Sequence, residues 1–144
     1  MELHGQTALV TGGTDGIGAQ LIRQLRAKGV TVITQGRNAE RSAATRAGGP
    51  VYCATKAALR SYSQALRAQL EGITVHVLEA LPPVVETKLT AGRGNNKMAP
   101  EECARQIVVA MEASAEEVNV GMVKLLQVVN SISPALARRI MIKF

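Results

Sequence analysis

The sequence predicts an α/β protein, a shortened Rossmann-like three-layer sandwich with a mainly parallel sheet of about four strands. Two observations carry this prediction. Short β-branched and apolar runs alternate with segments of helical periodicity, the pattern of parallel strands joined by helical crossovers. A glycine-rich stretch, Thr11-Gly-Gly-Thr-Asp-Gly-Ile-Gly18, stands between the first such run and the first helical segment. Nearly half of the 144 residues are apolar and almost none are aromatic, which suits Val-rich buried strands and excludes disorder.

The alternating segments define the expected elements. The strands are expected at Thr7–Val10, Val30–Thr34, Ile73–Leu81 and Val118–Val120. The helices are expected at Ile17–Lys28, Val51–Gln69, Pro100 to about Ala113 and, in two pieces broken near Pro134, Lys124–Phe144. Asn38–Pro50 and Val84–Asn96 lack apolar periodicity and read as loops. The sequence shows no repeat and no dividing linker, so we expect a single domain over residues 1–144.

Composition indicates which kinds of binding partner and which cellular compartment are expected. The net charge of +6 is spread over several segments, and the chain lacks aromatic residues for stacking on bases, so nucleic acid is not expected as a partner. No run approaches the ~18 apolar residues of a membrane span, and no signal-peptide pattern is present. Cys53 and Cys103 form no CxxC pair, which favours a reduced, cytoplasmic protein. His4 and His76 have no partner at metal-ligand spacing, so no metal site is expected.

The glycine-rich stretch predicts a phosphate-binding loop. Glycines let the backbone turn sharply and approach a ligand closely, because they carry no Cβ. The helix that begins there directs unpaired N–H groups and a partial positive charge at the occupant of the loop. A pyrophosphate fits this environment.

Tyr52 and Lys56 stand four residues apart near the start of the second predicted helix and therefore share one face. A nearby ammonium favours the phenolate and lowers the pKa of a tyrosine. The pair could give a proton to, or take one from, an alcohol or carbonyl oxygen. Taken alone, the spacing is more typical of an exposed tyrosine beside a solvated lysine.

Together, these motifs resemble those of the short-chain dehydrogenase/reductase family. Thr11–Gly18 and Tyr52-Cys-Ala-Thr-Lys56 occur in the family's order, and Pro82-Pro-Val-Val-Glu-Thr87 looks like its Pro-Gly-x-Val-x-Thr stretch with Pro83 in place of glycine. The similarity extends through Met98-Ala-Pro-Glu-Glu-Cys-Ala-Arg105. It covers most of the chain.

The resemblance implies a Rossmann fold and hydride transfer between NAD(P)(H) and a small carbonyl or alcohol. Tyr52 would be the general acid–base, and Lys56 would bind the nicotinamide ribose and lower the Tyr52 pKa. Val85 and Thr87 would contact the nicotinamide carboxamide. The remaining cofactor-binding residues implied by the match lie in the glycine loop: Thr11, Gly12, Thr14, Gly16, Ile17 and Gly18.

Arg37 lies just after the second predicted strand, where the adenosine ribose should sit. An acidic residue there would favour NAD, whereas an arginine can pair with the 2′-phosphate of NADP. Residues 35–38 include no acid. We therefore expect NADP, with NAD as second choice, although a solvated turn arginine explains Arg37 equally simply.

The chain departs from the family between Arg37 and Tyr52. Each βα unit takes about 30 residues, so roughly 90 residues are missing there. The family's catalytic Asn and the strand that ends in its catalytic Ser are gone, and Ser42, without a strand, would be poorly placed to replace that Ser. The alternative is therefore a catalytically impaired nucleotide-binding or structural remnant of the family.

Without these βα units, one apolar face of the second predicted helix would be left exposed. Leu59, Tyr62 and Leu66 would lack the helix against which this face normally packs. An uncovered apolar face predicts association, so a homodimer is expected.

Overall fold

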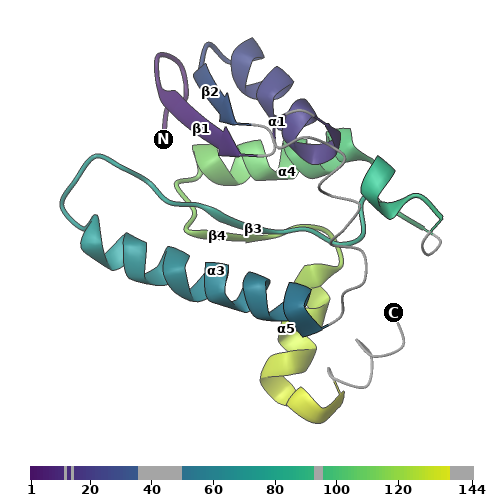
Figure 1. Ribbon diagram of the computed structural model, residues 1–144. Helices are drawn as coiled ribbons and strands as arrows, with labels where there is room; N and C mark the ends of the chain where they lie inside the picture. The colour runs from purple at the N-terminus through teal and green to yellow at the C-terminus, as the bar shows by residue number, and fades with distance from the viewer. Residues whose placement is uncertain (12, 14, 36–49, 93–95, 137–144) are drawn as a thin grey trace.

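The computed structural model describes residues 1–11, 13, 15–35, 50–92 and 96–136 (Figure 1). The strands are β1 (Thr7–Thr11), β2 (Thr31–Gln35), β3 (Glu79–Leu81) and β4 (Glu117–Asn119). The helices are α1 (Gly16–Ala27), α3 (Pro50–Gln69), the 3₁₀ helix η2 (Lys88–Thr90), α4 (Pro100–Glu112) and α5 (Val123–Ile132). The α/β class with parallel strands is confirmed. The predicted loop at Asn38–Pro50 lies outside the described residues except for Pro50, which begins α3.

The four strands form two separate parallel pairs. β1 pairs with β2, with Leu9 opposite Ile33, and β3 pairs with β4, with Ala80 opposite Val118. The prediction of a single sheet of about four strands is therefore wrong for the described residues. In a doubly wound sheet other strands lie between the first strand and the last two, and the described part of the chain supplies none of them.

β3 is shorter than predicted. The pattern indicated a strand over Ile73–Leu81, but only Glu79–Leu81 is strand. A strand persists only where a neighbouring strand satisfies its backbone groups. The neighbour of β3 is β4, which is itself three residues long, so residues 73–78 run alongside no partner strand.

Helices α1 and α4 pack against each other and connect the two strand pairs. One core cluster contains Leu25 of α1, Val10 of β1, Val30 just before β2, and Val108 of α4. A second cluster contains Cys103 and Ile107 of α4 with Val85 and Val120, which follow the carboxyl ends of β3 and β4. Leu21 of α1 packs against both clusters. The apolar face of α4 is therefore shared between the two halves of the molecule.

Polar contacts fix the α1–α4 pair at both ends. Gln20 Nε2 donates to Glu101 Oε1 at 2.6 Å, and Gln24 Nε2 donates to the Glu101 carbonyl at 2.9 Å. At the opposite end, Lys28 forms an ion pair with Glu112 at 2.6 Å. These contacts set the register of the two helices along their length.

α3 lies on the other face of β3–β4 from α4, giving three layers around this pair (Figure 1). Its contacts with the strands are largely polar: Arg60 forms an ion pair with Glu117 at 2.7 Å, and Arg67 donates to the carbonyls of Val77 and Glu116. Leu59 and Tyr62 are 54% and 61% exposed. The apolar face that the sequence marked on this helix is thus partly uncovered, although Leu66 is half-buried.

The remaining predictions for the second half match the structure closely. α4 and β4 begin and end within one residue of the predicted bounds. α5 ends at Ile132, just before Pro134, in agreement with a break in the C-terminal helical region. Among the helices in the described ranges, none has both the length and the apolar character of a membrane span.

Candidate functional site

The carboxyl ends of β1 and β3 and the first turns of α1 and α3 face the same side of the molecule, on the right in Figure 1. In open α/β sheets, ligands bind outside the carboxyl ends of the strands. The glycine loop, between β1 and α1, and the segment that follows β3 both lie on this side. This end of the fold is therefore the candidate site.

Two glycines of the loop occupy positions that no larger residue could fill. A Cβ on Gly13 would lie 2.2 Å from Thr34 Oγ1 and 2.3 Å from the Ile22 side chain. Gly16 has φ +55°, in the left-handed region, and a Cβ there would lie 2.8 Å from Thr87 Cγ2. Thr87 thus sits directly against the start of α1. The loop and the Pro82–Thr87 segment, predicted to serve one ligand, are in contact.

Asp15 caps α1 and connects it to η2. Asp15 Oδ1 accepts a hydrogen bond from the Gly16 N–H at 2.8 Å, and Asp15 Oδ2 lies 3.2 Å from Lys88 Nζ. The Gly16 hydrogen bond and then the Lys88 ammonium hold the pKa of the Asp15 carboxyl below its ordinary value. Asp15, just before α1, and Lys88, the first residue of η2, thus place an anion and a cation side by side at the start of α1.

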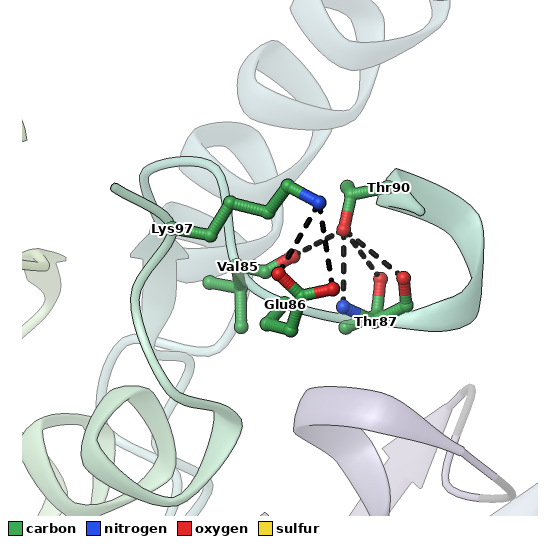
Figure 2. A network of polar contacts seen from close by, with 5 residues as sticks. All are labelled: Val85, Glu86, Thr87, Thr90 and Lys97. Atoms are coloured by element: carbon green, nitrogen blue, oxygen red, sulfur yellow. Dashed lines mark hydrogen bonds and ion pairs between the residues drawn. The ribbon is translucent and has the colours of Figure 1, made fainter. Parts of the chain in front are cut away.

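Thr90 fixes the Thr87 segment through a cluster of short contacts (Figure 2). The Thr87 N–H donates to Thr90 Oγ1 at 3.0 Å, and the two threonine hydroxyls are 3.2 Å apart. Thr90 Oγ1 also donates to the Val85 carbonyl at 2.5 Å, with the Thr87 carbonyl 3.1 Å away. One hydroxyl therefore holds three backbone groups of this turn.

A second set of contacts connects the same segment, at residues 84–86, to residues 97–98. Val85 forms an isolated parallel bridge with Met98, in which the Glu86 N–H donates to the Met98 carbonyl at 2.9 Å and the Met98 N–H to the Val84 carbonyl at 3.0 Å. The Lys97 side chain, only 9% exposed, forms an ion pair with Glu86 at 3.2 Å (Figure 2). The turn that carries Thr87 is thus held at both ends.

Tyr52 and Lys56 both lie in the N-terminal part of α3, one helical turn apart. The backbone of Tyr52 is helical, whereas its side chain is outside the described set. The Lys56 side chain is exposed and engaged in an interaction. The structure therefore supports the predicted helical spacing of the pair, and the distance from the phenol to the glycine loop stays a prediction.

The other predicted site residues divide by location. Thr11 ends β1 and is exposed, Ile17 packs against the second core cluster, and Gly18 is half-buried in α1. The Val85 side chain is 3% exposed, so a ligand contact by this residue would have to come from its backbone. Gly12, Thr14, Arg37 and Ser42 lie outside the described residues.

Sequence reasoning missed Asp15, Lys88 and Thr90. A signal was available for Thr90, because Thr87-Lys-Leu-Thr90 has the spacing of a capping box, in which the fourth residue caps the amide of the first. Asp15 is a favoured residue type immediately before a helix. Nothing local marks Lys88, since its contact with Asp15 depends on the approach of two distant segments.

Parts of the chain are similar to known proteins. Residues 42–98 match the model of the short chain dehydrogenase family. A 40-residue stretch is 60% identical to the uncharacterized oxidoreductase DltE of Bacillus subtilis strain 168, a match that spans 28% of this chain and 16% of that protein.

Solved structures agree on the fold. A short chain dehydrogenase from Burkholderia cenocepacia J2315, in complex with NADP, superposes with a TM-score of 0.76 at 20% identity, covering 96% of this chain and 98% of the other. A second short chain dehydrogenase/reductase family protein gives 0.64 at 22% identity, covering 81% and 95%. These two structures share the α/β fold of this chain. The similarity to the short chain dehydrogenase model covers residues 42–98.

Replacing Gly16 by alanine tests the contact between the loop and Thr87. Gly16→Ala should destabilise the fold more than Gly72→Ala, because both glycines have positive φ but a Cβ on Gly72 meets nothing within 4 Å. Each variant carries the left-handed penalty of about 1 kcal/mol, and only Gly16→Ala adds a steric clash. Urea unfolding measures the difference. Equal losses would contradict the contact.

The titration of Asp15 tests the link to Lys88. In Lys88→Gln, the pKa of Asp15 should rise toward its ordinary value of 3.8 without reaching it, because the Gly16 hydrogen bond is retained. Since the folded-state pKa is depressed, the stabilising contribution of the carboxylate is complete above its unfolded pKa and is lost as pH falls through the folded one. NMR titration of the side-chain carboxyl measures the shift. Lys28→Gln, at the far end of α1, is the control, and an unchanged pKa in Lys88→Gln would refute the link.

Proposed function

We propose that this chain binds NADP(H) and acts as an oxidoreductase that reduces a small carbonyl or oxidises an alcohol. The observation that carries the proposal is the contact between Gly16 and Thr87, because it joins the phosphate-binding loop to the segment expected to hold the nicotinamide. The match of residues 42–98 to the short chain dehydrogenase model and the NADP complex of one structural neighbour support the same proposal.

The residues present fit a dinucleotide at several points. The closely packed backbone at Gly13 and Gly16, together with the first turn of α1, suits a pyrophosphate. Lys88 Nζ, whose side chain is 88% exposed, adds a cation at the mouth of the loop. Thr87 and the backbone of Val85 would hold the nicotinamide carboxamide, and the proposed partner of the 2′-phosphate is Arg37.

The bound nicotinamide would supply or accept the hydride, and α3 would handle the proton. In the reducing direction, the Tyr52 phenol gives its proton to the substrate oxygen as the carbonyl is reduced. In the oxidising direction, the phenolate takes the proton from the alcohol. Lys56, one turn along the helix, favours the phenolate and binds the nicotinamide ribose.

A second candidate function is nucleotide binding without catalysis. The separation of the strands into two pairs favours this alternative, because no described strand supports a residue that could polarise the substrate carbonyl. Removing one such donor costs about 10²–10³ in rate. The same chain could therefore retain the cofactor and turn over slowly or not at all.

Cofactor titration followed by turnover separates these functions. The wild type should quench or shift NADPH fluorescence on binding and should reduce at least one member of a carbonyl panel. Tyr52→Phe should retain NADPH binding but lose about 10²–10⁴-fold in turnover, because the proton donor is gone. Tyr62→Phe, an exposed tyrosine on the same helix, should change neither quantity.

Each other result selects an alternative. Absence of NADPH binding by the wild type would overturn both the enzyme and the nucleotide-binding module. Binding with no turnover, or with turnover that Tyr52→Phe leaves intact, would overturn the proposed catalytic role and leave the binding module.

We also propose a homodimer located in the cytoplasm. Leu9 and Ile33 are cross-strand partners on the β1–β2 pair and are 70% and 56% exposed. Leu59 and Tyr62 on α3 are also exposed. Uncovered apolar surface of this kind favours association. The free, buried thiol of Cys103 suits a reducing compartment.

Light scattering after size exclusion tests the dimer. The wild type should elute with twice the 15.2 kDa chain mass. The double variant Leu9→Thr, Ile33→Thr places β-branched threonines, which favour strands, at both positions and should shift the protein toward monomer if this face is the interface. A strictly monomeric wild type would refute the proposal. Lys124→Gln, on the exposed surface of α5, is the control.

A further inference from the structure

Thr90 has no part in the proposed chemistry, yet its hydroxyl is the centre of the network in Figure 2. We propose that Thr90 is a positioning residue that sets the hydrogen-bond polarity of Thr87, making the Thr87 hydroxyl an acceptor toward the ligand. The segment would then select a ligand group that donates, such as a carboxamide N–H₂, over one that only accepts, such as a phosphate oxygen. This inference rests on the proposed function.

The polarity follows from counting donors and acceptors. A threonine hydroxyl has one hydrogen to donate and two lone pairs that accept. Carbonyl oxygens only accept, so the Thr90 hydrogen goes to the Val85 carbonyl at 2.5 Å, with the Thr87 carbonyl at 3.1 Å as its other acceptor. The Thr90 oxygen accepts the Thr87 N–H at 3.0 Å.

The remaining contact, between the two hydroxyls at 3.2 Å, is then determined. Because the Thr90 hydrogen is already used, Thr87 must be the donor in this pair. The Thr87 hydrogen is then engaged by Thr90, and the Thr87 oxygen retains lone-pair capacity. Thr87 can accept a hydrogen bond from a ligand without losing this contact, whereas donating one would break its hydrogen bond to Thr90.

Packing of the Thr87 side chain fixes its χ1 rotamer. Its Cγ2 methyl lies against Gly16, where even an added Cβ would come within 2.8 Å. A χ1 rotation that turned the hydroxyl away from Thr90 would also move this methyl out of its contact with the loop. The glycine loop and Thr90 thus fix opposite sides of the same side chain.

Acceptor polarity suits one part of the proposed cofactor. The nicotinamide carboxamide carries an N–H₂ donor, whereas the pyrophosphate presents acceptors only. Donor groups for the pyrophosphate are available elsewhere, at the backbone of α1 and at Lys88. The geometry therefore assigns different ligand groups to the two contacting segments.

The test compares two dinucleotides that differ in a single donor. NADP⁺ carries the carboxamide, and its 3-acetylpyridine analogue keeps the carbonyl but replaces N–H₂ by a methyl group. Calorimetry should show that the wild type prefers NADP⁺ by about threefold to tenfold, the range of one neutral hydrogen bond. Thr90→Val should abolish the preference, because the Thr87 hydrogen then has no acceptor on residue 90 and can be donated to the carbonyl that both dinucleotides carry. Thr90→Ser, which keeps the hydroxyl, should restore it, and Thr74→Val at an exposed position should leave it unchanged.

2′,5′-ADP, which lacks the nicotinamide, separates a local effect from a general one. Its affinity should be the same in the wild type, Thr90→Val and Thr90→Ser. An equal loss for 2′,5′-ADP and NADP⁺ in Thr90→Val would show a merely structural role and overturn the inference, as would a preference that survives the substitution. A wild type that binds NADP⁺ and its analogue equally overturns the inference alone, whereas one that binds no dinucleotide overturns the proposed function.

Amide exchange in the ligand-free chain tests the Thr90 contact independently of any ligand. The Thr87 N–H should exchange slowly in the wild type and in Thr90→Ser, and faster in Thr90→Val, because its acceptor is removed. Unchanged exchange in Thr90→Val would refute the positioning role even if the chain binds no nucleotide.

Discussion

The packing of α1 against α4 is the interaction on which the rest of the structure depends. Two short strand pairs, each with few internal hydrogen bonds, would be marginal by themselves. The facing helices bury Leu25 and Val108 in one cluster and Cys103 and Ile107 in the other, so a single helix–helix interface completes both cores. Glu101, through Gln20 and Gln24, fixes how far one helix can slide along the other.

That register has a direct consequence for the candidate site. α1 begins at the glycine loop, and α4 follows directly after the Met98 bridge that closes the turn carrying Thr87. Holding the two helices together therefore brings the loop and the turn into contact, although 71 residues separate Gly16 from Thr87. The site persists without a continuous sheet because helices, rather than neighbouring strands, position its two halves.

The sequence predicted the locally determined features well. The bounds of α1, α3 and α4 follow from periodicity, capping residues and Pro100, all of which act within one or two turns. The length of β3 and the splitting of the sheet could not be read in this way, because a strand depends on partners far along the chain. Within the site, the motifs identified Gly16 and Thr87. Thr90 lies three residues beyond the Pro82–Thr87 motif, and its role depends on contacts with the backbone of its own turn, so the motif did not identify it.

The arrangement of the two strand pairs also affects the order in which the parts of the chain fold. β1–α1–β2 and β3–α4–β4 are each a complete strand–helix–strand unit, closed by contacts over a few tens of residues. Chains with such local contacts lose less loop entropy before they gain stabilising contacts, so each unit can begin to form early. Both cores are completed only when α1 packs against α4. Docking of the two units is then the late event in folding. The candidate site, which lies across that junction, is complete only in the fully folded chain.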